Sequence, residues 1–215
     1  MNDILNNMEF VRMFERRLAD YTGFKYAVCT DCCTNGILLS LELLYRLNEI
    51  DKQNILEIPC HTYMSVPMTL MNNGWRIKLI EKNWLGNYQI GNTIVYDAAT
   101  DFDKNMALRY SDHSLVCVSF QQKKRLSLGR GGAILTNNKK YSDILCRMVY
   151  DGRNPFRSDN EEIANNSNDI VLGYHCYMDP EKAAIGITKL NQLRDPYMPN
   201  TEAQYPDLRK LNIWM

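Results

Sequence analysis

Short apolar segments alternate with segments whose apolar residues recur at helical spacing, and this alternation constrains the fold more than any other feature. A strand buried on both faces is short and continuously apolar, whereas an amphipathic helix places apolar residues three and four apart. Alternating strands and helices are typical of an α/β protein. We therefore expect a three-layer α/β/α fold with a mostly parallel central sheet flanked by helices. The expected strands are residues 25–30, 54–59, 75–81, 93–100, 114–120 and 131–138, and the expected helices are residues 9–21, 31–47, 61–74, 140–152 and 180–193.

Length and charge exclude several classes of protein. The chain has 215 residues, with 25 Lys and Arg against 25 Asp and Glu. This length predicts one large domain, alone or with an appendage. Balanced charge without a basic stripe argues against nucleic-acid binding, and no apolar run approaches the roughly 18 residues of a membrane span. The N-terminal segment mixes charged and apolar residues, unlike a signal peptide. We expect a soluble, cytoplasmic protein with neither nucleic-acid nor membrane partners.

The seven cysteines favour reduced, mostly buried thiols, because their number is odd and several lie in apolar segments. A CxxCC motif at residues 29–33, followed later by Cys60-His61, resembles part of a zinc site. However, zinc sites of this type use a second pair of ligands at a defined spacing, and no second CxxC pair stands there. We therefore expect no metal site, and we interpret His61 and His113 as structural residues.

Polar residues gather where the expected strands end. In open α/β sheets, ligands bind outside the carboxyl ends of the strands. Residues 30–36 open a helix at such an end, and the free N–H groups and dipole of a helix N-terminus favour an anion. The side chains at these ends that could bind a ligand or take part in a reaction are Thr34, Tyr63, Asp97, Ser119 and Lys124.

These residues are the parts needed to hold pyridoxal phosphate. Its phosphate would take the helix N-terminus and hydroxyl groups, and its ring would stack on an aromatic side chain. A carboxylate would keep the pyridine nitrogen protonated, and a lysine would form a Schiff base. Taken singly, each residue also has an ordinary interpretation: Lys124 as a surface lysine, Asp97 as a helix cap and Tyr63 as a half-buried ring.

Several motifs, in order along the chain, resemble the DegT/DnrJ/StrS family of pyridoxal-phosphate-dependent sugar aminotransferases. They are FERRLADYTGFKYAV, PCHTYMSVPMTLMNNGW, VYDAAT, SFQQKKRLSLGRGGAILT and GYHCYMDPEKAAIGITKL. Together they cover about residues 14–193. The resemblance implies a fold-type-I architecture, like that of aspartate aminotransferase, and an active site shared between two subunits.

The resemblance also implies residue roles. Ser119, Phe120 and Lys124 match the family's S-F-x-x-x-K motif, which favours Lys124 over Lys123 as the Schiff-base lysine. Asp97 matches the acid that pairs with the pyridine nitrogen. The implied catalytic residues are Lys124 and Asp97, and the implied cofactor-binding residues are Cys33, Thr34, Tyr63, Asp97, Thr100, Ser119, Lys124 and His175.

The chain departs from the family's pattern at several residues and in length. Cys32-Cys33 replaces the usual Ser-Gly of the phosphate loop, and Thr100 replaces a Gln or His near the ring hydroxyl. His175 stands where the family has an Asn that reaches the phosphate of the neighbouring subunit. Typical members also continue into a small C-terminal domain. We expect a cofactor-binding large domain over residues 1–195 and a tail over residues 196–215 in place of that domain.

The resemblance implies an aminotransferase that moves an amino group from glutamate or glutamine to a keto sugar, expected to be nucleotide-linked, through pyridoxamine phosphate. Lys124 argues against the related dehydratases, which carry His at this position. Two alternatives remain open: a catalytically reduced relative that binds or regulates, and a pyridoxal enzyme that acts on an amino acid. The expected active unit is a homodimer.

Overall fold

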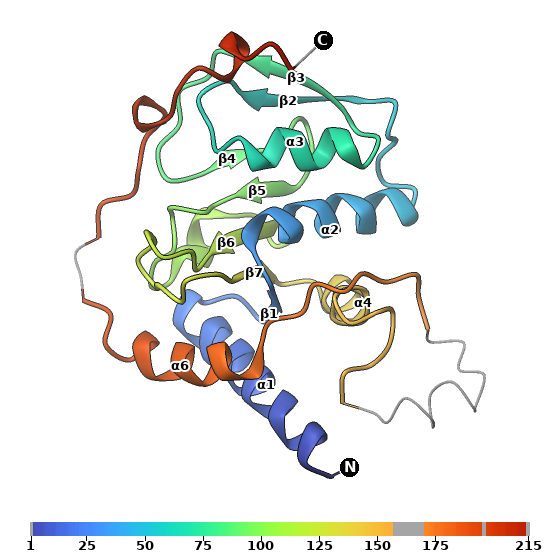
Figure 1. Ribbon diagram of the computed structural model, residues 1–215, viewed down its shortest axis with the longest axis vertical. Helices are drawn as coiled ribbons and strands as arrows, with labels where there is room; N and C mark the ends of the chain where they lie inside the picture. The colour runs from blue at the N-terminus through green and yellow to red at the C-terminus, as the bar shows by residue number, and fades with distance from the viewer. Residues whose placement is uncertain (1, 157–169, 195–196, 214–215) are drawn as a thin grey trace.

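The computed structural model describes residues 2–156, 170–194 and 197–213. The chain is an α/β protein in which helices cover two faces of a mixed sheet (Figure 1). The helices are α1 (Asn2–Thr22), α2 (Cys33–Arg46), α3 (Ser65–Asn72), α4 (Lys139–Met148) and α6 (Pro180–Leu190). The strands are β1 (Tyr26–Thr30), β2 (Ile55–Pro59), β3 (Arg76–Ile80), β4 (Tyr88–Gln89), β5 (Val95–Asp97), β6 (Leu115–Ser119) and β7 (Gly132–Thr136). Three short 3-10 helices are Met106–Arg109, Glu202–Gln204 and Leu208–Lys210.

The main sheet has the strand order β1-β7-β6-β5-β4, and β2 pairs with β3 in a separate two-stranded sheet. Only the β5–β6 and β2–β3 pairs are parallel; β1–β7, β6–β7 and β4–β5 are antiparallel. The sheet is therefore mixed, with fewer parallel pairs than expected, and the α/β class is confirmed. The cause is the loop 120–131, which folds β7 back beside β6 as a long hairpin and so reverses the direction of one central strand.

The two faces of the sheet bury separate apolar clusters. Successive side chains of a strand point to opposite faces, so Cys117 joins a cluster with α2 and α4, whereas Val116 and Val118 join a cluster with α1. Helices α1 and α6 pack side by side (Figure 1). Their contact is close at Gly186, where an added Cβ would lie 2.6 Å from the ring of Phe14. This layering confirms the three-layer arrangement and leaves the strand ends open.

The C-terminal tail runs along the β2–β3 end of the molecule (Figure 1). The backbone N–H of Leu208 donates to the carbonyl of Cys60 at 3.0 Å, and that of Gly86 donates to Asn200 at 2.8 Å. The tail is thus joined by backbone hydrogen bonds to the loops after β2 and β3. Part of the polar loop expected over residues 153–172 lies outside the described residues. In the part of the chain that the structure describes, no helix has the length and apolar character of a membrane span.

Candidate active site

A cavity of about 400 Å³ opens where the carboxyl ends of β1, β5 and β6 meet. These three strands run in the same direction, because β7 is antiparallel to both β1 and β6 and β5 is parallel to β6. Their ends therefore bring residues that are distant in the sequence to one edge of the sheet. The predicted site residues that line this cavity are Cys33, Thr34, Tyr63, Asp97, Thr100, Ser119 and Lys124.

Two helix N-termini meet at the cavity. The hydroxyl oxygens of Thr34, in the first turn of α2, and Ser65, the first residue of α3, lie 2.7 Å apart. The first N–H groups of a helix have no partner within that helix, and the dipole adds partial positive charge. Thr34 and Ser65 therefore make a small cradle of donors that suits a phosphate or another anion.

The cradle needs a close approach between strand β7 and the start of α2. A Cβ on Gly132 would overlap the backbone of Cys32 and Cys33 and would lie 2.7 Å from the carbonyl carbon of Cys32. Any larger residue at position 132 would push the two elements apart. Gly132, at the end of the glycine turn that follows Lys124, is therefore needed for close packing of β7 against the start of α2.

Asp97, the last residue of β5, is 5% exposed and is held by fixed donors. Its Oδ2 accepts a 2.7 Å hydrogen bond from the Tyr88 hydroxyl, and its Oδ1 accepts one from the backbone N–H of Ala99 at 2.9 Å. The Tyr88 hydroxyl also lies 2.5 Å from the hydroxyl of Thr62. Burial raises the pKa of Asp97, and these donors and the nearby Lys124 oppose that rise. These hydrogen bonds hold the Asp97 carboxyl group in one orientation in the wall of the cavity.

Lys124 lies in the 120–131 loop and lines the cavity, whereas its neighbour Lys123 is exposed and does not. The backbone N–H of Lys124 donates to Gln121 at 2.8 Å, which forms a tight turn. Burial lowers the pKa of Lys124, and Asp97 and Cys33 partly oppose this. A lowered pKa increases the neutral fraction of an amine, which is its nucleophilic form.

The other predicted residues at the cavity have distinct surroundings. Thr100 is buried, and its hydroxyl donates to the carbonyl of Gly86 at 3.0 Å. The hydroxyl of Ser119 accepts from the backbone N–H of Gln121 at 3.3 Å. Tyr63 is 55% exposed at the cavity, so one side of its ring is open to a ligand.

Two predicted residues differ from the others. The Cys33 thiol is buried, with Sγ 3.4 Å from the carbonyl of Cys117, so its side chain packs in the core and its backbone N–H, at the start of α2, is the group suited to an anion. His175 does not line the cavity: it is exposed, and its Nδ1 lies 3.0 Å from Asp151. The structure brings seven of the eight predicted cofactor-binding residues together and leaves His175 apart.

Sequence reasoning missed several residues of the cavity wall. Ser65 lies two residues after Tyr63 and had a usable signal, a hydroxyl near the start of the helix expected over residues 61–74. Tyr88 lies in a two-residue strand, and no local pattern marks it. The missed residues that line the cavity include Thr62, Ser65, Trp84, Tyr88, Arg130 and Tyr205.

The CxxCC motif does not join Cys60-His61 in a metal site. Among the described residues, the group of three or more metal-ligating side chains that lie close together is Cys60, His61 and Asp207. None of these residues lines the cavity. All seven cysteines are free.

The DegT/DnrJ/EryC1/StrS aminotransferase family model matches residues 1–83 and 93–203. No curated protein matches the chain. A sugar aminotransferase from Micromonospora echinospora superimposes with a TM-score of 0.66 at 16% identity, over 85% of this chain and 60% of that one. NtdA from Bacillus subtilis, with bound cofactor PMP, superimposes with a TM-score of 0.61 at 17% identity, over 88% and 52%.

A GDP-4-keto-6-deoxymannose-3-dehydratase variant with bound GDP-perosamine superimposes with a TM-score of 0.66 at 17% identity, over 86% of this chain and 61% of that one. The chain thus spans only 52–61% of the length of these three structures. At such identities the likeness shows the fold, and it confirms the expected fold-type-I architecture. Because the family model covers most of the sequence, the chain belongs to the DegT/DnrJ/EryC1/StrS aminotransferase family.

Proposed function

We propose that this chain is a pyridoxal-phosphate-dependent aminotransferase whose acceptor is a keto sugar. The observation that carries the proposal is the convergence of Lys124, Asp97 and the Thr34–Ser65 cradle on one cavity. A lysine amine, a buried carboxylate and an anion cradle are separate requirements of this cofactor, and each comes from a different element of the fold. Membership of the family supports the same conclusion.

The residues present fit the cofactor. A cavity of about 400 Å³ lies within the range of about 300–1,000 Å³ that is usual for small-molecule sites. Thr34 and Ser65 would hold the phosphate, and the exposed ring of Tyr63 would cover one face of the pyridine. Ser119, which also lines the cavity, would bind the phosphate or the ring substituents, and Thr100 would accept from the ring hydroxyl, since its own proton is donated to Gly86. When bound, pyridoxal phosphate supplies an electron sink for the carbon that gains or loses the amino group.

The protein's own groups perform the binding and proton-transfer work. Burial favours the neutral form of the Lys124 amine, so Nζ would be able to bond to the carbonyl carbon of the cofactor with release of water, and would be able to accept or give up a proton. Asp97, oriented by Tyr88, provides the negative charge that keeps a ring nitrogen protonated. Lys123 is directed to solvent and takes no part.

Part of the cavity lining suits a sugar. Trp84 and Tyr205 lie with ring centroids 5.4 Å apart, and both line the cavity, as does Arg130. Sugar rings commonly stack on aromatic faces, and a guanidinium binds phosphate oxygens with paired donors. We infer a nucleotide-linked keto sugar as acceptor and glutamate or glutamine as donor. Seven free cysteines are consistent with a cytoplasmic location.

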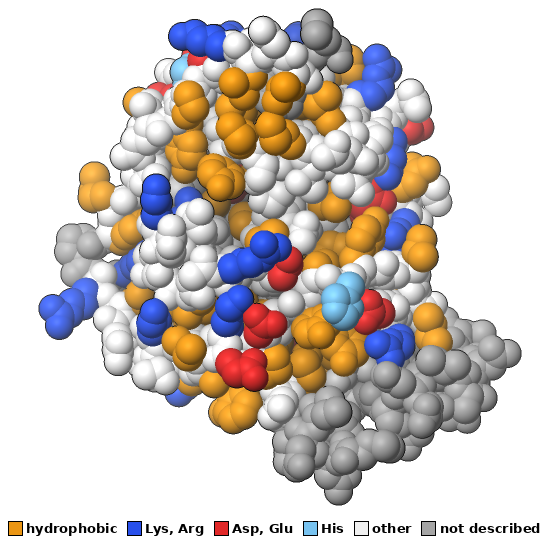
Figure 2. Space-filling model, in the orientation of Figure 1, with side chains coloured by type: hydrophobic (Ala, Val, Ile, Leu, Met, Phe, Trp, Pro, Cys, Tyr) orange, Lys and Arg blue, Asp and Glu red, His pale blue; other side chains and the backbone are white. Residues whose placement is uncertain are grey.

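We also propose a homodimer in which His175 of each subunit acts at the other subunit's cavity. His175 is exposed outside its own cavity, as a residue that acts in trans would be. Figure 2 shows hydrophobic side chains gathered over α3. Met64 and Met71, at the two ends of this helix, are 42% and 37% exposed, and Tyr63 precedes them at the cavity rim. An apolar surface next to the site is what a shared interface requires.

The test begins with the cofactor. Purified protein mixed with pyridoxal phosphate is expected to gain a near-visible absorbance band, and glutamate or glutamine is expected to convert the cofactor to pyridoxamine phosphate with release of the oxo acid. A set of nucleotide-linked keto sugars is then expected to restore the first band. Absence of the band would indicate a reduced relative with a binding or regulatory role. A band that responds to amino acids but to no keto sugar would indicate an enzyme that acts on amino acids.

A further inference from the structure

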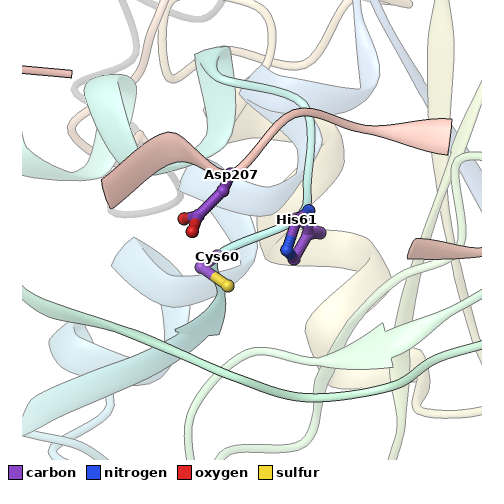
Figure 3. A group of neighbouring side chains, drawn as sticks. All are labelled: Cys60, His61 and Asp207. Atoms are coloured by element: carbon purple, nitrogen blue, oxygen red, sulfur yellow. The ribbon is translucent and has the colours of Figure 1, made fainter. Parts of the chain in front are cut away.

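A thiol, an imidazole and a carboxylate meet where the C-terminal tail crosses the end of β2. Cys60 and His61 follow β2 directly, and Asp207 belongs to the tail (Figure 3). His61 and Asp207 form an isolated antiparallel bridge, and the N–H of Leu208 donates to the carbonyl of Cys60. One ligand atom from each of the three side chains lies within 4.8 Å of the other two. Backbone pairing, and not a chance approach of flexible side chains, holds the group together.

The hydrogen bond of His61 prepares its ring for a metal. Nδ1 lies 2.8 Å from the backbone carbonyl oxygen of Tyr205. A carbonyl oxygen can only accept, so Nδ1 carries the proton and Nε2 presents its lone pair. Metal-binding histidines usually donate their second N–H to a carbonyl or carboxylate in this way, which fixes the ring and its tautomer. The Nε2 lone pair of His61 is directed to the side where Glu81 lies, with Oε1 at 3.7 Å.

Glu81 can complete the group. Its Oε2 is 3.5 Å from Sγ of Cys60, and its side chain is 61% exposed and so can shift. Arg209 donates to Asp207 and to Glu81, at 2.8 Å and 2.7 Å. Oδ1 of Asp207 accepts two hydrogen bonds from Arg209, whereas Oδ2 of Asp207 accepts one and keeps a lone pair for a cation. Arg209 bonds to Oε2 of Glu81, and Oε1 of Glu81 lies 3.7 Å from Nε2 of His61. Arg209 therefore orients both acids and leaves each with an oxygen for the metal. With a divalent cation bound, three anionic ligands would balance this cation and Arg209.

We propose that Cys60, His61 and Asp207, with Glu81 as the fourth ligand, bind a zinc ion. Thiolate and imidazole ligands favour zinc over magnesium and calcium, which prefer oxygen alone. Ligands about 2.0–2.3 Å from a tetrahedral zinc lie about 3.3–3.8 Å from one another. The present separations, up to 4.8 Å, therefore require ligand atoms to move by on the order of 1 Å. Small side-chain rotations achieve this, and binding releases the thiol proton to solvent.

The zinc would fasten the tail beside the cavity. Tyr205, whose carbonyl holds His61, lines the cavity, and so does Trp84, whose Nε1 donates to the carbonyl of His61 at 2.9 Å. A metal on His61 would therefore fix both aromatic residues of the cavity wall. The metal site itself does not depend on the function proposed above, because none of its ligands lines the cavity.

The experiment is metal titration of the 215-residue chain after treatment with a chelator. Zinc binding is measured by competition with a chromophoric chelator, and cobalt(II) is used as a spectroscopic probe of the thiolate. We expect one equivalent of zinc and a sulfur-to-cobalt charge-transfer band in the near ultraviolet. Cys60→Ser is expected to abolish the band, and His61→Gln is expected to weaken zinc binding at least about tenfold. The matched controls, Cys146→Ser and His113→Gln, change the same residue types outside the group and are expected to bind like the unmodified protein.

Three outcomes would overturn the proposal: binding of less than one equivalent, a cobalt complex without the charge-transfer band, or equal affinity in the unmodified and His61→Gln proteins. If Cys60→Ser does not fold, the cobalt spectrum of the unmodified protein and the affinities of His61→Gln and Asp207→Asn still decide the question. A second readout is proteolysis of the tail. Zinc is expected to slow cleavage in the unmodified protein and to have no effect in Asp207→Asn.

Discussion

The Tyr88 hydroxyl donates a 2.7 Å hydrogen bond to Oδ2 of Asp97, although Tyr88 lies in a two-residue strand at the edge of the sheet. Strand β4 pairs with β5 in a register that places Tyr88 directly opposite Asp97. A cross-strand pair of this kind brings two side chains together on one face. Burial raises the pKa of Tyr88 far above its ordinary value, so its hydroxyl stays protonated and acts as a donor.

Tyr88→Phe is expected to destabilise the protein in a pH-dependent manner. Burial raises the pKa of Asp97 in the folded state above its value in the unfolded state. Ionised Asp97 therefore lowers the free energy of unfolding at neutral pH, and this loss of stability disappears as the pH falls and Asp97 becomes protonated. Loss of the Tyr88 donor raises that pKa further. We expect a loss of about 1.5–3 kcal/mol at neutral pH, the usual value of a hydrogen bond to a charged group, and a smaller loss in acid. Urea unfolding at both pH values measures it.

The control for Tyr88→Phe is Tyr141→Phe. Tyr141 also donates at 2.7 Å to a carboxylate, that of Glu49, but neither residue lines the cavity. Both variants are expected to lose stability, and only Tyr88→Phe is expected to weaken pyridoxal phosphate binding. Equal losses of stability at neutral and acidic pH in Tyr88→Phe would show that Asp97 is not the group that titrates.

Lys124→Ala is expected to abolish covalent attachment of the cofactor, whereas Lys123→Ala leaves it intact. The physical reason is position: Lys124 lines the cavity beside Asp97, and Lys123 points to solvent. Borohydride reduction followed by peptide mapping checks this, with the label expected on Lys124. A label on Lys123 would reject the assignment.

The pH dependence of the same reaction carries further information. Burial lowers the pKa of Lys124, and Asp97 opposes that change. Attachment, which needs the neutral amine, is therefore expected to extend to lower pH than for a solvent-exposed lysine. In Asp97→Asn the opposing charge is gone, so the profile is expected to move to still lower pH.

The local features of this fold were predictable, because short apolar segments and helical periodicity are read within a single element. The choice of Lys124 over Lys123 came from the spacing to Ser119 and from the family's motif. Strand direction was not predictable in the same way. Residues 131–138 have the hydropathy of a strand in either direction, and the hairpin that reverses β7 is set by tertiary packing of the loop before it.

Partners from distant segments were the other limit of sequence reasoning. Tyr88 reaches Asp97 only because β4 pairs with β5, and two strand residues are too few for a periodic signal. Likewise, Cys60 and His61 are adjacent in the sequence, but Asp207 reaches them through the tail. A zinc-site pattern defined by a second CxxC pair does not include a carboxylate nearly 150 residues away in the sequence.

Gly132→Ala is expected to cost at least about 3 kcal/mol in the free energy of unfolding, at the upper end of overpacking effects, because the added Cβ would overlap the backbone of Cys32 and Cys33. Backbone atoms at the start of α2 cannot rotate away as a side chain can. Cofactor phosphate binding is expected to fail as well. Gly129→Ala is the control: no atom lies within 4 Å of its added Cβ, and only its φ of +80° is strained, so about 1–2 kcal/mol is expected. Similar losses in the two variants would contradict the packing role of Gly132.

His175→Ala is expected to be inactive, and mixing it with Lys124→Ala is expected to restore activity. The proposed dimer places His175 of one subunit at the cavity of the other, and obligate interfaces commonly bury more than about 2,000 Å².

A heterodimer of the two variants then has one cavity with both unmodified residues and one with neither. Random exchange makes about half of the dimers mixed, so up to about a quarter of the unmodified activity is expected to return. The control is a mixture of His113→Ala with Lys124→Ala. Because His113 is not part of the site, this mixture is expected to have the same activity as unmodified protein mixed with Lys124→Ala at the same ratio. If sedimentation shows an active monomer, or if subunits exchange without any gain in activity, His175 does not act across an interface, and its contact with Asp151 is a structural one.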